Sequence, residues 1–246
     1  MKLLLFFLLF FAFLETSCDA PKGSEKVVSQ SINFVAEGRN NRSIPIQIYC
    51  NSDKNAVNNR LAVINPGYKG EKTNYSFLAK KLAENDYTVD SIQHDLPTND
   101  PIANTGNLYE LRMPVWERGV QNVQFVIAEI KKQYPNLDYQ NLILIGHSMG
   151  GDISMLFSQK YPEQVSAITL DHQRMPIPRT NKPRILSIRA DEVEADKGLL
   201  PTEDEQKTFG IKIVNLKNTK HADLSDAGST ETKKQVSAII LEFLKN

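Results

Sequence analysis

The chain has 246 residues, which is enough for one large domain or two small ones. Its 29 lysine and arginine residues balance 29 aspartate and glutamate residues, so the formal net charge is zero. This balance argues against a nucleic-acid-binding protein, which would need a basic surface. Hydrophobic residues make up 41% of the sequence, sufficient for a sizeable core. Two cysteines are too few for a disulfide-stabilised scaffold or a four-cysteine zinc site.

An apolar segment at the start of the chain predicts export. Lys2 precedes an unbroken apolar run, residues 3–14, and small and polar residues follow up to Ala20, which is the pattern of a secretory signal peptide. A twelve-residue helix rises only about 18 Å, against a hydrocarbon core of roughly 30 Å, so the run is too short to span a membrane. We therefore expect residues 1–20 to be a signal peptide and residues 21–246 to be the periplasmic or secreted protein.

Cys18 allows a second interpretation of this segment. Bacterial lipoproteins carry their lipid on the cysteine that follows such an apolar run. Glu15 departs from that pattern, because an apolar residue is usual three positions before the lipidated cysteine. A lipid anchor at Cys18 therefore stays open as the alternative to a protein released without one.

After residue 25 the sequence alternates between strand-like and helix-like segments. Two runs of alternating apolar and polar residues, 27–36 and 44–50, flank a polar pentapeptide and predict a β-hairpin. Further strands are expected at residues 61–64, 87–93, 141–145, 165–170, 184–188 and 211–216. Helices are expected at residues 74–85, 115–134, 152–160 and 232–244. This alternation predicts one α/β domain, with a mainly parallel sheet wrapped by helices and an antiparallel hairpin at its start.

A G-x-S-x-G pattern lies between a predicted buried strand and a predicted helix, with Ser148 at its centre. In this context the pattern is typical of a nucleophile elbow, a sharp turn that lifts the serine hydroxyl clear of the sheet. Glycine is needed at Gly146 and Gly150 because the strand and the helix approach each other closely there. We therefore expect Ser148 to be a catalytic nucleophile.

A serine hydroxyl needs a base that takes its proton, and the sequence has four histidines. His221 follows the last predicted strand and precedes the last predicted helix, so it would reach the carboxyl edge of the sheet. His147 precedes the serine, and its side chain is expected to point away from the serine hydroxyl. We therefore expect it to have a packing role. His94 and His172 follow strands that end at the same edge, and we expect hydrogen-bonded loop residues there. His221 is therefore the expected base.

The base in turn needs a carboxylate that fixes its tautomer. An acidic run follows the strand predicted at 184–188, and Asp191 and Glu192 are its two candidates, between which the sequence does not decide. Two backbone N–H groups should bind the oxyanion of the tetrahedral intermediate. We expect them from Met149, which follows the nucleophile, and from Tyr68, in the loop after the third strand.

This order of serine, acid and histidine resembles that of the α/β-hydrolase family, as do the opening hairpin, Pro66-Gly67-Tyr68 and the elbow. The resemblance covers the chain after residue 25 and implies an eight-stranded, mainly parallel sheet with helices on both faces. It also implies serine-dependent hydrolysis through an acyl-enzyme, without a cofactor. The chain departs from many members at Asn65, where they have histidine, and in its displaced or replaced acid.

Many relatives carry a lid of helices after the sixth strand. Here residues 171–183 are short and rich in proline, so we expect an open site. The segment 94–113, with Tyr109 and Leu111, is the expected wall of the substrate pocket.

The sequence has no phosphate-binding loop and no zinc-binding helix motif, so we expect neither a metal nor a cofactor. The expected activity is hydrolysis of small carboxylic esters by an exported enzyme without a membrane span. A peptidase or acyltransferase of the same fold and a non-catalytic binding protein are the alternatives. The sequence does not determine the oligomeric state.

Overall fold

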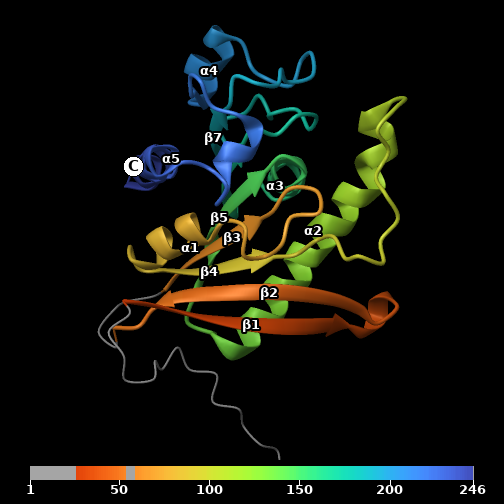
Figure 1. Ribbon diagram of the computed structural model, residues 1–246, viewed down its shortest axis with the longest axis vertical. Coiled ribbons are helices and arrows are strands. Elements are labelled where there is room, and N and C mark those ends of the chain that lie inside the picture. The colour runs from red at the N-terminus through yellow and green to blue at the C-terminus, as the bar shows by residue number, and fades with distance from the viewer. Residues whose placement is uncertain (1–25, 54–58, 246) are drawn as a thin grey trace, which may run out of the picture.

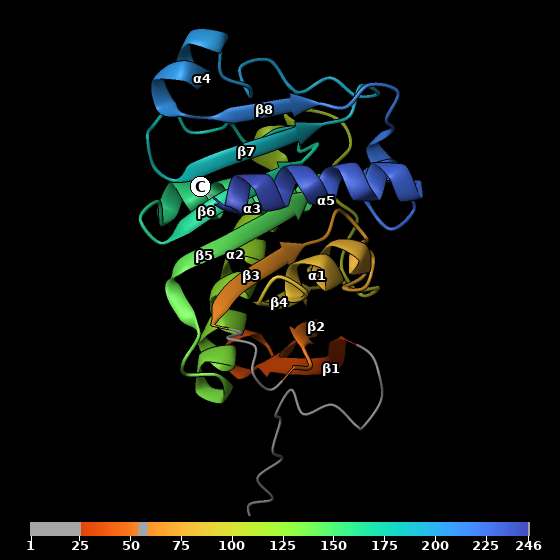
Figure 2. The same ribbon diagram turned by 90° about the vertical axis from the view of Figure 1, so that its left-hand side faces the viewer.

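The computed structural model describes residues 26–53 and 59–245. Their strands form one eight-stranded sheet in the order β1-β2-β4-β3-β5-β6-β7-β8 (Figures 1 and 2). The strands are β1 (Val27–Ala36), β2 (Arg42–Asn51), β3 (Arg60–Asn65), β4 (Tyr87–Ile92), β5 (Asp138–His147), β6 (Val165–Leu170), β7 (Arg184–Arg189) and β8 (Lys212–Asn215). Strand β2 is antiparallel to both of its neighbours, and the strands from β4 to β8 in the sheet order are parallel. The expected α/β fold is confirmed.

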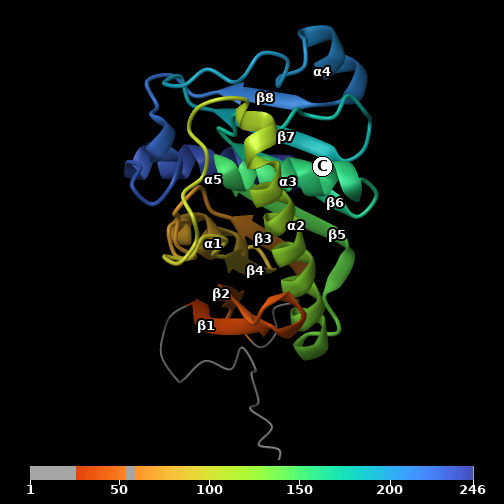
Figure 3. The same cartoon turned by 90° about the vertical axis from the view of Figure 1, so that its right-hand side faces the viewer.

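Helices cover both faces of this sheet. They are α1 (Ser76–Ala83), α2 (Leu108–Gln133), α3 (Met149–Lys160), α4 (Glu203–Phe209) and α5 (Thr230–Lys245), with short 3₁₀ turns η1 (Glu37–Arg39) and η2 (His221–Leu224). Helices α1 and α5 lie on one face (Figure 2), and α2 and α3 lie on the other (Figure 3). Each face therefore has its own buried apolar layer, and the parallel strands between them are covered on both sides.

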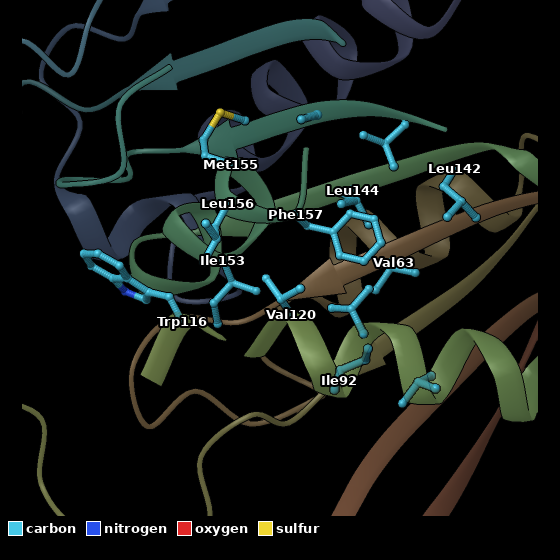
Figure 4. Packing of buried hydrophobic residues seen from close by; sticks show 14 of the residues in the cluster. Val63, Ile92, Trp116, Val120, Leu142, Leu144, Ile153, Met155, Leu156 and Phe157 are labelled. Atoms are coloured by element: carbon cyan, nitrogen blue, oxygen red, sulfur yellow. The ribbon is translucent and has the colours of Figure 1, made fainter. Parts of the chain in front are cut away.

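The layer between the sheet and helices α2 and α3 includes Trp116, Val120 and Ile153, all buried (Figure 4). Gly119 lies where the two helices meet. A Cβ atom at that position would lie 2.4 Å from Ile153 Cδ1, so the absence of a side chain permits this close approach.

Helix α2 begins at Leu108, seven residues before the predicted start, and contains Pro114 in its interior. The side chain of Asn107 accepts a hydrogen bond from Glu110 N at 3.4 Å and caps the helix. The expected wall residues Tyr109 and Leu111 are therefore helical, and they are 40% and 53% exposed. The predicted start was wrong because the helix continues through Pro114 and its cap, Asn107, lies seven residues before that proline.

Helix α4 was not predicted, although its first residues carry a recognisable signal. Thr202 Oγ1 accepts from Glu205 N at 3.2 Å, and the Glu205 carboxylate accepts from Thr202 N at 2.8 Å. This reciprocal pair is a capping box, whose T-x-x-E spacing is visible in the sequence.

No helix among residues 26–53 and 59–245 is long and apolar enough to cross a membrane. The predicted signal peptide and Cys18 lie outside the described residues. Cys50, at the end of β2, is 2% exposed and disulfide-bonded.

Candidate active site

Ser148 lies in the turn between β5 and α3, with φ 51° and ψ −120°. A non-glycine residue rarely adopts this conformation, and its strain is typical of functional turns. A Cβ atom at Gly146 would lie 2.1 Å from Gly150 O, and one at Gly150 would lie 1.8 Å from Asn65 O. Both positions therefore require glycine, as the elbow pattern predicts.

The imidazole of His221 lies beside this elbow. Its ring centroid is 4.4 Å from that of His147, the residue preceding Ser148. Its Nδ1–H donates to Asp171 Oδ2 at 2.6 Å, which leaves Nε2 as the ring atom able to accept a proton. Ser148 Oγ makes no hydrogen bond within the described ranges, and such contacts commonly tighten only when substrate binds.

The carboxylate that orients the ring is not one of the two expected. Asp191 accepts backbone N–H bonds from Asn218 at 2.6 Å and Thr219 at 3.0 Å. Glu192 accepts the backbone N–H of His221 at 2.8 Å. Both acidic residues therefore hold the backbone of the loop that carries His221. The expectation that Asp191 or Glu192 pairs with the ring is corrected to Asp171.

Asp171 follows β6 directly and has a left-handed backbone, with φ 50°. Its second oxygen, Oδ1, pairs with Arg189 Nη2 at 3.0 Å, and the two side chains are 0% and 4% exposed. A buried carboxylate needs such compensation, which Arg189 supplies from the end of β7. The sequence signal was a charged residue directly after a strand, one strand earlier in the chain than the strand after which the acid was expected.

His147 has a defined role that the sequence did not suggest. Its Nε2 lies 3.0 Å from the backbone carbonyl of His221 and must donate, because a carbonyl only accepts. Its Nδ1 therefore accepts from the hydroxyl of Tyr75, at 2.7 Å. Burial, followed by the nearby His221, lowers the pKa of His147 to about 3, so the ring is neutral. The chain from Tyr75 through His147 fixes the backbone of His221.

Of the two expected oxyanion donors, Met149 is part of the elbow and Tyr68 belongs to the loop that packs against it. Met149 is the first residue of α3, and its N–H has no hydrogen-bond acceptor within the described residues. The N–H of Tyr68 is likewise unpaired there. The preceding residue, Gly67, is against the elbow, since a Cβ there would lie 3.4 Å from Ser148 Cβ. Two unpaired N–H groups next to a serine are what an oxyanion site requires.

His94 and His172 are buried, hydrogen-bonded residues, as expected. His94 Nε2 donates to Asn65 Oδ1 at 2.9 Å, so Asn65 has a structural role behind the elbow. His172 Nε2 donates to Met175 O at 3.1 Å. Burial lowers the pKa of each histidine to about 3, so neither carries charge near neutral pH.

A cavity of about 560 Å³ opens beside the Tyr68 loop. Its lining is mixed in character and comprises Tyr68, Lys69, Glu71, Gln93, Asp95, Leu96, Pro97, Asn99, Asp100 and Pro101. No helix lies in the segment 171–183, so that side of the site carries no helical lid. The start of the segment 94–113, part of the expected pocket wall, lines this cavity, whereas Ser148 and His221 do not. In residues 26–53 and 59–245, no group of three or more His, Cys, Asp or Glu side chains could hold a metal ion.

Comparisons with known proteins agree with this fold. The family model described as serine aminopeptidase, S33, matches residues 57–171. A serine hydrolase-like protein from Danio rerio is 37% identical over 46 residues. That match covers 19% of this chain and only 14% of the relative's length.

Several solved structures share the fold at low identity. A ferulic acid esterase from Streptomyces cinnamoneus matches with a TM-score of 0.59 and 16% identity, over 89% of this chain and 84% of that one. A dienelactone hydrolase-like promiscuous phosphotriesterase from metagenomic libraries has a TM-score of 0.65 and 13% identity, over 90% and 99%. A lidless α/β serine hydrolase from Xanthomonas campestris has a TM-score of 0.61 and 14% identity, over 88% and 94%.

At these identities the solved structures establish the fold alone. The order of the eight strands, the elbow between β5 and α3 and the matching family model agree with one another. The chain has the α/β-hydrolase fold, and its residues 57–171 match a family model of serine hydrolases of this fold.

Proposed function

We propose that the protein is an exported serine hydrolase that cleaves carboxylic esters through an acyl-enzyme on Ser148. The observation that carries the proposal is the bond of 2.6 Å between His221 Nδ1 and Asp171 Oδ2, with the ring held beside the elbow. This bond fixes the tautomer in which Nε2 is free to take the serine proton.

Each step has a group to perform it. Ser148 Oγ attacks the ester carbonyl carbon while His221 Nε2 takes its proton, and Asp171 stabilises the imidazolium. The N–H groups of Met149 and Tyr68 bind the oxyanion. The imidazolium then gives its proton to the leaving alcohol. A water molecule, deprotonated by the same imidazole, attacks the acyl-enzyme and releases the acid.

The segment 171–183 contains no helix that could act as a lid, which favours small esters that reach the site directly from solvent. Several solved structures of this fold are esterases, which also favours an ester as the substrate. A peptidase or an acyltransferase would use the same groups and differ only in the leaving group or in the acceptor that replaces water.

Labelling with a fluorophosphonate probe tests the nucleophile. The intact protein should be labelled, Ser148→Ala should not, and Ser31→Ala should be labelled as the parent is, because Ser31 is exposed on the edge strand β1. Absence of label on the folded parent would instead support a non-catalytic binding protein. A series of p-nitrophenyl esters of increasing acyl length, run beside peptide amides, then separates esterase from peptidase.

Export is proposed from the sequence of residues 1–20. Expression of the full chain in a bacterium, followed by fractionation and mass spectrometry of the N-terminus, tests it. Cleavage after Ala20 supports a released protein, and a lipid-modified N-terminal Cys18 supports the anchored alternative. An intact N-terminus on protein recovered from the cytoplasmic fraction would contradict both.

A further inference from the structure

Three arginine side chains from separate elements converge on one pocket beside the hairpin. Arg39 comes from η1 and Arg42 from the start of β2, three residues later, whereas Arg118 comes from α2 and is distant in the sequence. The pocket has a volume of about 580 Å³, and its other lining residues are Asn40, Asn41, Ser43, Leu96, Thr98 and Gln121. Neither Ser148 nor His221 lines it, so it is separate from the candidate active site.

The positive charge in this pocket is not balanced. The lining contains no acidic residue. The nearest carboxylate paired with the cluster is Asp95, whose Oδ1 lies 3.4 Å from Arg118 Nη2. Burial lowers the pKa of Arg39 and Arg42, and repulsion from Arg118 lowers both further. Three guanidinium groups therefore share one carboxylate.

Two donors of this cluster are buried without an acceptor. Arg39 Nη1 and Arg42 Nε have no hydrogen-bond partner in the described part of the chain. Arg42 Nη2 is held by His94 O at 2.7 Å and Asn99 Oδ1 at 3.0 Å, which fixes the orientation of this guanidinium. A buried donor left unpaired costs free energy, and a native structure rarely leaves one on a charged group without a reason.

We propose that this pocket is a binding site for an oxyanion, a phosphate or carboxylate group of a small molecule. Guanidinium groups present planar pairs of N–H donors that match such anions. An anion in the pocket would accept from the guanidinium donors that reach its surface, such as those of Arg118, whose side chain is 30% exposed, and would offset the excess charge. The neutral amide and hydroxyl groups that line the rest of the pocket can bond to its remaining oxygens.

Calorimetric titration of the full-length protein with inorganic phosphate tests the site. The expected result is saturable binding at one site, with the affinity reduced tenfold or more in Arg39→Gln and in Arg118→Gln. Arg60→Gln is the matched control, because Arg60 lies at the start of β3, packed on the Tyr87 ring, and loses the same charge. This variant should bind phosphate as the parent does.

Three further titrations identify which anion the pocket binds and whether binding depends on the candidate active site. Sodium acetate in place of phosphate distinguishes a carboxylate site, which acetate also occupies, from one that requires a phosphate group. Sodium chloride at equal ionic strength should give no saturable heat. Ser148→Ala should retain phosphate binding, so this result is independent of catalysis.

Two results would overturn the proposal. One is absence of saturable binding of both phosphate and acetate to the folded parent. The other is equal binding by the parent, Arg39→Gln and Arg118→Gln, each shown to be folded by its thermal transition.

Discussion

The side chain of His147 and the backbone carbonyl of His221 are joined by a hydrogen bond of 3.0 Å across 74 residues of sequence. On its other side, His147 is bonded to Tyr75, whose hydroxyl also lies 3.5 Å from Gly67 N. The loops after β3, β5 and β8 are therefore tied to one another at the candidate active site. A buried, fully bonded chain of this kind restrains the base in one position.

Tyr75→Phe should therefore lower kcat for ester hydrolysis several-fold while leaving KM nearly unchanged. The substitution removes the hydroxyl that orients His147 and keeps the ring in place. Tyr87→Phe is the matched control, since its hydroxyl accepts from Arg60 at 3.3 Å, at the opposite end of β4. Both variants should lose similar thermal stability, and only the first should lose turnover. Equal turnover in the two would show that the chain through His147 is merely structural.

Asp171→Asn should reduce kcat by about 10³ to 10⁴, as expected when the base loses the carboxylate that fixes its tautomer. Asp191→Asn and Glu192→Gln should each reduce it less than tenfold, because these residues bond to backbone N–H groups. Steady-state kinetics with a p-nitrophenyl ester give the comparison. The assignment of Asp171 fails if Glu192→Gln proves the more damaging substitution in folded protein.

Asp90 makes the stability of the fold depend on pH. Its carboxyl is wholly buried in β4, and neither oxygen has a partner in the described residues. Burial raises its pKa from 3.8 to about 7. Between these two pH values the folded state keeps a proton that the unfolded state releases, so stability falls as the pH rises. At about 1.4 kcal/mol per pH unit, the loss is about 4 kcal/mol by pH 7.

Asp90→Asn should remove this dependence, because the amide does not titrate. Urea unfolding of the parent and the variant at a series of pH values from 4 to 8 measures it. The free-energy difference between them should grow in favour of the variant up to about pH 7 and then level off. Asp204→Asn, which alters an exposed carboxylate, should show no such trend. A constant difference across the series would mean that Asp90 is ionised when the protein is folded at low pH.

Gly119→Ala should destabilise the fold by about 1–3 kcal/mol, because the added methyl group overlaps Ile153 Cδ1. Ile153→Val removes that atom, so the double variant should recover part of the loss. A double-mutant cycle of unfolding free energies measures the coupling. Strictly additive effects would show that α2 and α3 separate to accommodate the methyl group.

The strands and the elbow could be predicted because their signals are local. Apolar runs such as residues 61–64 favour a buried strand, and the elbow needs glycine at fixed positions around Ser148. The partner of His221 could not be predicted in this way. Asp171, Asp191 and Glu192 all lie at the same edge of the sheet, and the choice depends on side-chain directions set by tertiary contacts such as the bond to Arg189. The role of His147 was missed for the same reason, since its two partners come from distant segments.

The contacts that hold His221 are made where strands end, by Asp171 after β6, Glu192 after β7 and His147 at the end of β5. The middle of each strand contributes only volume and apolar surface, which many combinations of side chains can supply. Substitutions in the interior of the sheet should therefore disturb the candidate site less than substitutions at this edge. The low identity of solved structures with the same fold, 13–16%, agrees with a sheet interior that many sequences can fill.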